Sequence, residues 1–238
     1  MRDVPVIFSA PMVQSLLREV EAPGTGKTMT RRLAWGEPFT VYDDEDGEQA
    51  AKLRKKGCKV SGPDDTSARI AWPPSPWQRV KAGDRLWVRE SVKGEPNAEG
   101  WDGVRYAADN AWIMSTAANA EEADEFVALY RYGGKRGASV PSIHMPRWVS
   151  RITLIVTATK IERLTTITEA DAIAEGVEHR GERDYWAGLN RGTDAVACFS
   201  ALWRSLHGMG SWDKNPEVVA LTFKVIKANI DKPEARAA

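Results

Sequence analysis

The stretch Arg151-Ile152-Thr153-Leu154-Ile155-Val156-Thr157-Ala158-Thr159 carries the clearest structural signal in this sequence. Its β-branched residues and its alternation of apolar and polar side chains are typical of a strand with one buried face. Outward from it, the same kind of pattern predicts shorter strands over Val4–Phe8, Thr28–Leu33, Gly83–Glu90 and Val218–Ile226. Because strands dominate the well-patterned parts and helices lie between them, the predicted fold class is α+β, built on a barrel or an open sheet.

The predicted helices have recognisable starts. Ser9 can cap a helix that carries Pro11 in its first turn, and Thr168 can cap another that has Asp171 at its third position. Apolar residues at helical spacing then predict helices over Ser9–Val20, Ala120–Leu129, Glu169–Val177 and Asp194–Leu206.

Two segments interrupt this pattern. Residues 36–78 and 93–140 have few periodic apolar positions and contain runs of charge and proline, which indicates surface insertions. We therefore expect one domain over residues 1–230 with these two insertions, followed by a flexible tail at 231–238.

Composition limits the possible partners. The 238 residues include 33 basic and 33 acidic side chains, so the net formal charge is zero. A protein that coats long nucleic acid usually has a basic excess. We therefore expect no tight binding to duplex DNA, and a small ligand or a local patch for any nucleic acid. The oligomeric state cannot be predicted from these features.

The cell compartment is predicted from cysteines and apolar runs. Cys58 and Cys198 are far apart in unlike settings, which favours free thiols over a single long-range disulfide. No apolar run approaches the ~18 residues that span a bilayer, and the N-terminus does not resemble a signal peptide. A cytoplasmic protein without a membrane partner is expected.

The sequence contains no convincing motif for a metal site or for a nucleotide phosphate. His144, His179 and His207 are dispersed, so no metal site and no cofactor are expected. Gly24-Thr25-Gly26-Lys27-Thr28 invites a phosphate-loop interpretation, but Glu21 stands where that motif requires glycine. A helix precedes this segment and a strand follows it, which is the reverse of the order that the motif needs.

The order of the remaining motifs resembles the ASCH family, in particular long members from phages and prophages. This resemblance implies a PUA-like β-barrel with flanking helices. The segments that carry it are Ile7–Val13, Thr28–Arg32, Gly83–Val88, Ser142–Trp148 and Leu164–Glu169.

Within that family, Lys27-Thr28-Met29-Thr30-Arg31-Arg32 is similar to the Lys-Thr-x-Thr-x-Arg pattern of bacterial N(4)-acetylcytidine amidohydrolases. The resemblance implies that Lys27 activates Thr30 as a nucleophile and that Glu175 assists. In one departure, Thr25 stands where the family has a glycine two residues before the lysine. The expected partner is a modified nucleoside or a short single-stranded RNA. The alternatives are a non-catalytic module that binds RNA or modified nucleic acid, and an ASCH-type ribonuclease.

Further residues are candidates for substrate binding. Arg32 or the backbone N–H groups of the Gly24–Gly26 turn are expected to stabilise an oxyanion, and Trp148 with its neighbours to contact a base. The candidates are Ser9, Gly26, Arg32, Glu90, His144, Arg147 and Trp148.

Each of these residues also has a structural interpretation. Lys27 near a helix C-terminus can be solvated, Thr30 is a good strand former, and Trp148 can belong to the core. Glu175 shares a helical face with Asp171 and Glu178, which indicates a solvated acidic stripe.

A geometric condition separates these interpretations. Lys27 and Thr30 are three residues apart, and on a regular strand that spacing points their side chains to opposite faces. If they act together, Lys27 must lie in the Gly24–Gly26 turn before the strand, or a bulge must intervene. The glycines favour the turn. The catalytic hypothesis predicts that Lys27, Thr30 and Glu175 line one pocket, close enough for hydrogen bonds directly or through one water. It also predicts that Arg32 shares the face of Thr30.

Overall fold

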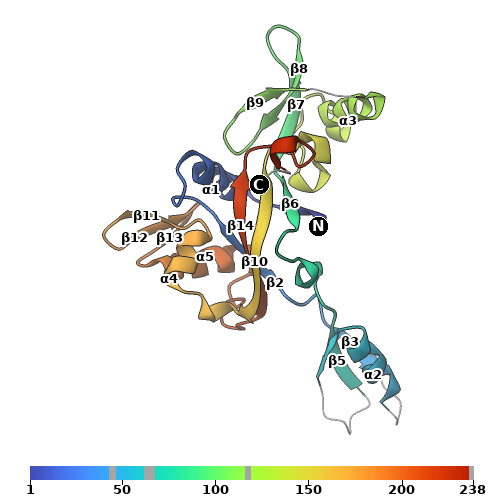
Figure 1. Ribbon diagram of the computed structural model, residues 1–238, viewed down its shortest axis with the longest axis vertical. Coiled ribbons are helices and arrows are strands. Elements are labelled where there is room, and N and C mark those ends of the chain that lie inside the picture. Colours follow the sequence, from blue (N-terminus) through green and yellow to red (C-terminus); the bar gives the residue numbers. More distant parts are fainter. Residues whose placement is uncertain (43–46, 62–67, 116–118, 236–238) are drawn as a thin grey trace.

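A five-stranded sheet forms the centre of the computed structural model, which describes residues 1–42, 47–61, 68–115 and 119–235 (Figure 1). The first pair of strands, β1 and β6, is parallel, and every other neighbouring pair is antiparallel. In spatial order the strands are β1 (Asp3–Ile7), β6 (Arg85–Arg89), β10 (Thr153–Arg163), β14 (Glu217–Ile226) and β2 (Met29–Leu33).

The longest strand, β10, contains the stretch that dominated the sequence pattern. Its first half is buried, with Leu154 and Val156 in the main core, whereas its second half is largely exposed. A register shift between Val156 and Ala158 separates the two halves, and such irregularities bend a strand.

Three helices lie beside this sheet (Figure 1). They are α1 (Ala10–Glu21), α4 (Glu169–Ala174) and α5 (Ala195–His207). Ser9 and Thr168 stand at the predicted N-cap positions, but only Thr168 caps its helix with its side chain. The Thr168 hydroxyl accepts the N–H of Asp171 and the Asp171 carboxylate accepts the N–H of Thr168, which completes the expected capping box. Helix α4 is shorter than predicted, because Gly176 adopts a φ of 100° and turns the chain.

Two smaller sheets extend from opposite ends of the central body in Figure 1. They fall within the predicted insertions, whose sequences did not predict the ordered strands found there. One contains β3 (Phe39–Tyr42), β5 (Ala68–Trp72) and β4 (Lys59–Ser61), with helix α2 (Glu48–Lys55). The other contains β7 (Val92–Pro96), β8 (Asp102–Tyr106) and β9 (Trp112–Met114), with helix α3 (Ala120–Tyr130).

The sequence pattern also did not predict a fourth sheet. It is a short meander between α4 and α5, formed by β11 (Glu178–Gly181), β12 (Asp184–Ala187) and β13 (Asn190–Gly192). These strands are three or four residues long and rich in charge and glycine, so they offer no sustained alternation.

Residues 231–235 do not fit the predicted flexible tail. Ala235 is fully buried, and Asp231 forms an ion pair of 2.8 Å with Arg147. The Arg85 guanidinium donates to the carbonyl of Ile230 at 2.8 Å. Residues 236–238 lie outside the described residues.

The fold class is α+β, as predicted. Cys58 and Cys198 are free thiols. None of the helices in the described ranges has the length and apolar character required to cross a bilayer.

Candidate functional site

A cavity of about 360 Å³ opens between the start of α1, strand β2, the end of α4 and helix α5. We call it the Lys27 cavity. Its apolar wall comes mainly from α5, with contributions from the end of β1 and the start of α1, and its polar wall mainly from β2 and the end of α4. The polar lining residues are Ser9, Lys27, Thr30, Arg31, Arg32, Ser91, Ser142, Glu175 and His207.

Lys27 enters the cavity from the turn that joins α1 to β2. Its backbone N–H donates to the carbonyl of Ser15 at 3.1 Å, and the regular strand begins only at Met29. The turn is held close to α1, because a Cβ on Gly26 would lie 2.3 Å from the Ser15 carbonyl oxygen. Lys27 therefore precedes the strand, as the catalytic hypothesis requires.

Lys27 and Glu175 form a buried ion pair. The lysine Nζ lies 2.7 Å from Oε2 of Glu175 and 2.6 Å from its carbonyl oxygen. Only 1% of Lys27 and 4% of Glu175 are exposed. Burial lowers the pKa of Lys27, and the positive charges of Arg32 and Arg31 act in the same direction against the opposing effect of Glu175. The site thus favours the neutral amine more than water does.

Glu175 faces inward because the helix ends before it. It is the C-cap residue of α4, and the left-handed Gly176 then redirects the chain. A Cβ on Gly176 would lie 2.6 Å from the Ser15 hydroxyl, so the turn is packed against α1. The interpretation of Glu175 as part of a solvated stripe is therefore wrong.

Thr30 and Arg32 share one face of β2 and both line the Lys27 cavity. Thr30 is 4% exposed, and within the described part of the chain its hydroxyl has no hydrogen-bond partner. Lys27, Thr30 and Glu175 therefore line one cavity, and Lys27 and Glu175 lie within hydrogen-bond distance. Hydrogen-bond reach between Thr30 and this pair stays a prediction.

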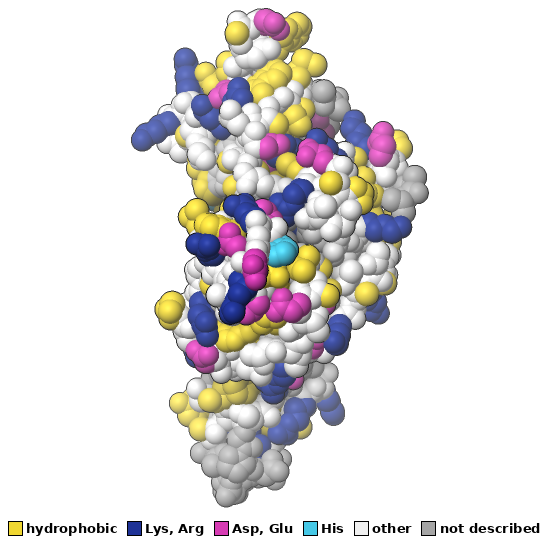
Figure 2. All heavy atoms as spheres, turned by 90° about the vertical axis from the view of Figure 1, so that its left-hand side faces the viewer, with side chains coloured by type: hydrophobic (Ala, Val, Ile, Leu, Met, Phe, Trp, Pro, Cys, Tyr) yellow, Lys and Arg dark blue, Asp and Glu magenta, His cyan; other side chains and the backbone are white. Residues whose placement is uncertain are grey.

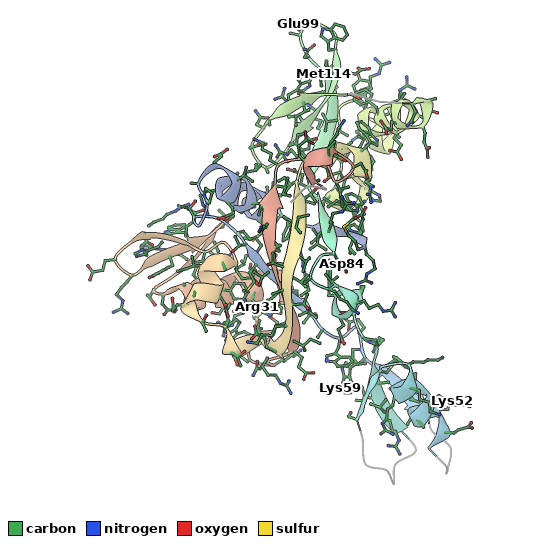
Figure 3. All side chains as sticks on the ribbon, viewed as in Figure 1. Arg31, Lys52, Lys59, Asp84, Glu99 and Met114 are labelled. Atoms are coloured by element: carbon green, nitrogen blue, oxygen red, sulfur yellow. The ribbon has the colours of Figure 1, made fainter. Side chains whose placement is uncertain are left out.

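Arg31 is a component of the site that sequence reasoning missed. It lies between the central sheet and α4 (Figure 3), where Nη2 bonds to Glu162 at 2.8 Å and to Asp171 at 2.9 Å. Its Nη1 lies 3.4 Å from Glu175. The acidic residues of α4 predicted only a solvated stripe, but they are the signal in the sequence that could have pointed to a basic partner.

The backbone of the glycine turn is not available to a substrate. The Glu19 carboxylate accepts the N–H of Gly26 at 2.9 Å and that of Gly24 at 3.0 Å. Gly26 does not line the cavity, so its predicted binding role and the oxyanion role of this turn are wrong.

Glu90 and Trp148 also lie away from the cavity. Glu90 is buried and accepts two hydrogen bonds from Arg151, at 2.8 and 2.9 Å, while burial raises the pKa of Glu90. Trp148 packs against a buried apolar cluster separate from the main core, which includes Val92 and Phe126.

Two further candidates take structural roles. Arg147 bonds to Asp3 at 2.6 Å and to Asp231, and the His144 ring lies 5.6 Å from that of Tyr132. Of the seven predicted binding residues, the structure brings only Ser9 and Arg32 to the cavity.

Helix α5 supplies a wall that was not predicted. Its apolar stripe indicated a core helix, and most of it is buried, yet Leu206 is 61% exposed. The exposure of Leu206 and the polar His207 next to it are the features that distinguish the C-terminal end of α5 from a helix buried in the core. The residues of α5 that line the cavity are Phe199, Leu202, Trp203, Leu206 and His207.

A glycine substitution tests how the turn positions Lys27. We expect Gly26→Ala to lower the free energy of unfolding by about 1–3 kcal/mol, because its methyl group would overlap the backbone of α1. Gly210→Ala is the control, since a Cβ there meets nothing within 4 Å. Chemical denaturation measures both, and equal stability of the two variants would contradict the proposed packing.

The surface around the site carries mixed charge. Figure 2 shows basic and acidic side chains interspersed over the face that lies to the left in Figure 1. Among the residues that the structure describes, no group of three His, Cys, Asp or Glu side chains is placed to hold a metal ion.

Comparisons of this chain with protein-family models, with curated proteins and with solved structures find no match.

Proposed function

We propose that this protein is an amidohydrolase of the ASCH type that removes an acyl group from a modified nucleoside such as N(4)-acetylcytidine. The observation that supports this function is the meeting of Lys27, Thr30 and Glu175 at one cavity, from segments nearly 150 residues apart in sequence. A buried lysine whose pKa is lowered, in the same cavity as a threonine hydroxyl, can activate that weak nucleophile.

In the proposed reaction, the neutral Lys27 amine accepts the proton of Thr30 as the threonine oxygen attacks the acyl carbonyl carbon. The lysine then returns the proton to the leaving exocyclic nitrogen as the carbon–nitrogen bond breaks. Water attacks the resulting acyl-threonine ester, which releases the carboxylic acid and restores the threonine hydroxyl. Glu175 holds the lysine in place through both steps.

The same proposal includes the PUA-like barrel. Strands β1 and β2 are the two edges of the central sheet, yet the Arg32 guanidinium on β2 donates to the carbonyl of Ile7 on β1 at 2.8 Å. A side chain can reach from one edge to the other only if the sheet is strongly curled, as in a barrel.

The size of the cavity favours a small substrate. A volume of about 360 Å³ lies near the lower end of the ~300–1,000 Å³ range of small-molecule sites. Incubation with N(4)-acetylcytidine and with a short RNA, followed by chromatography, separates the candidate functions. Cytidine and acetate are the expected products. Cleaved RNA would indicate a ribonuclease, and two unchanged compounds would indicate a binding module.

The proposed role of Lys27 predicts a pH dependence. Because the neutral amine is the base, hydrolysis should rise with pH through the pKa of Lys27, which lies below the ~10.4 of a free lysine. The profile of kcat against pH measures this, and Lys27→Met is the control because it should be inactive at every pH. A wild-type rate that does not change between pH 5 and pH 10 would contradict the assignment.

A further inference from the structure

The Arg32 guanidinium is the cation of the Lys27 cavity that has no carboxylate partner among the described residues. Lys27 pairs with Glu175, and Arg31 pairs with three acidic side chains. Arg32 instead donates through Nη2 to the carbonyl of Ile7. Its Nε is buried without an acceptor in the described part of the chain.

Two aromatic rings hold this guanidinium in position. Its Cζ lies 5.1 Å from the centre of the Phe8 ring and 5.4 Å from that of Trp77. Such stacking fixes an arginine without neutralising its charge. Burial lowers the pKa of Arg32, and the charge of Glu175 opposes this effect only in part.

The N-terminus of α1 opens at the same end of the cavity. Ser9 is its N-cap residue and lines the cavity, but no side chain caps the helix and its first turn has no acidic residue. The carbonyl of Ile7, which accepts from Arg32, lies just before this N-terminus. The first turn of this twelve-residue helix offers the N–H groups of Ala10 and Met12, since Pro11 has none, and the positive end of its dipole.

A histidine completes this end. His207 is the last residue of α5 and lines the cavity, with its ring 4.1 Å from that of Trp203. Burial and the charge of Arg32 lower the pKa of His207, so the imidazole is mostly neutral at pH 7 in the free protein. A neutral imidazole with one N–H remains a hydrogen-bond donor.

We propose that Arg32, the α1 N-terminus and His207 form a subsite for the phosphate group of a nucleotide, so that the substrate is an acylated nucleoside monophosphate. The identity of the base rests on the proposed function, whereas the anion subsite rests on the contacts above. Planar guanidinium donors and helix N–H groups both match phosphate oxygens. Thr30 lies two residues before Arg32 on the same face of β2. In this arrangement, a nucleotide whose phosphate binds Arg32 places its acylated base near Thr30.

Binding tests this subsite without any hydrolysis. Isothermal titration of the full chain with cytidine and with cytidine 5′-monophosphate compares two ligands that differ only in the phosphate and lack the acyl group. We expect the monophosphate to bind about tenfold more tightly or better, the effect of one or two charge-assisted hydrogen bonds. We expect Arg32→Met to remove this difference and Arg32→Lys to retain part of it.

Arg89→Met is the matched control. Arg89 also donates to a backbone carbonyl, that of Ile143, and stacks on a tryptophan, with Cζ 5.2 Å from the ring of Trp87. It does not line the Lys27 cavity. This variant should keep the phosphate preference of the wild-type protein.

The possible outcomes separate the subsite from the proposed function. Equal affinity of the wild-type protein for cytidine and its monophosphate would overturn the subsite, even if N(4)-acetylcytidine is hydrolysed. A preference that survives in Arg32→Met would overturn the role of Arg32. A preference that depends on Arg32, found in a protein that hydrolyses no acetylcytidine, would support the subsite and reject the hydrolase.

Discussion

Thr30→Val is expected to abolish hydrolysis of N(4)-acetylcytidine, with a loss of at least about 10³-fold in kcat, because loss of a nucleophile typically removes most of the catalysis. Valine keeps the shape of threonine and replaces only the hydroxyl. Since the Thr30 hydroxyl lines the cavity and valine keeps the packing of this buried residue, the free energy of unfolding should change by less than about 1 kcal/mol.

The control for this variant is Thr222→Val. Thr222 lies on the neighbouring strand β14, opposite Met29, and lines a separate groove. Its replacement makes the same chemical change in the same sheet and should leave hydrolysis intact. Initial rates measured by chromatography compare the two variants. Wild-type turnover by Thr30→Val would remove the nucleophile from the proposed mechanism.

Glu175→Gln is expected to produce the largest loss of stability, about 3 kcal/mol at pH 7, because it leaves Lys27 buried without its counter-charge. The loss should depend on pH. Glu175 raises the pKa of Lys27 against the effect of burial, so the pKa falls further in the variant. The unfolded chain then binds the lysine proton more readily than the folded one below about pH 10.4, and stability decreases as pH falls.

The deficit relative to the wild-type protein should therefore increase as pH falls through the wild-type pKa of Lys27, as measured by chemical denaturation at several pH values including 6 and 9. Glu90→Gln is the control, since Glu90 is also buried and pairs with Arg151 rather than with a lysine. It should destabilise the protein without affecting hydrolysis. If the deficit of Glu175→Gln were smaller at pH 6 than at pH 9, the inferred state of Lys27 would be wrong.

Much of the central fold could be predicted from the sequence, because its strands and helices carry their own local signals. The alternating residues of β10 and the capping box at Thr168 and Asp171 predicted their elements correctly. The insertions and the meander β11–β13 gave no such signal. Their strands are all three to five residues long, so they depend on their neighbours for pairing more than on periodicity.

The candidate site was predicted where residues are neighbours in the sequence, and less well where the fold brings them together. Lys27, Thr30 and Arg32 share one short segment, so their common cavity followed from the turn before the strand. The apolar spacing of α5 predicted a helix but could not show that it lines a cavity, because the wall of an apolar cavity and a buried core are built from the same residue types. Glu90 and Arg147 were wrongly predicted to bind substrate. In the structure Glu90 pairs with Arg151 and Arg147 with Asp3, which is a common role for charged residues that are buried or clustered.

The most direct test of the central claim is the location of the acyl group during turnover. The purified protein is mixed with excess N(4)-acetylcytidine, quenched in acid within the first turnover, and digested for peptide mass spectrometry. The proposed mechanism predicts an acetyl group on Thr30 in the wild-type protein and none at that position in Thr30→Val. Release of cytidine with the acetyl group on Lys27, or on no residue at all, would contradict it.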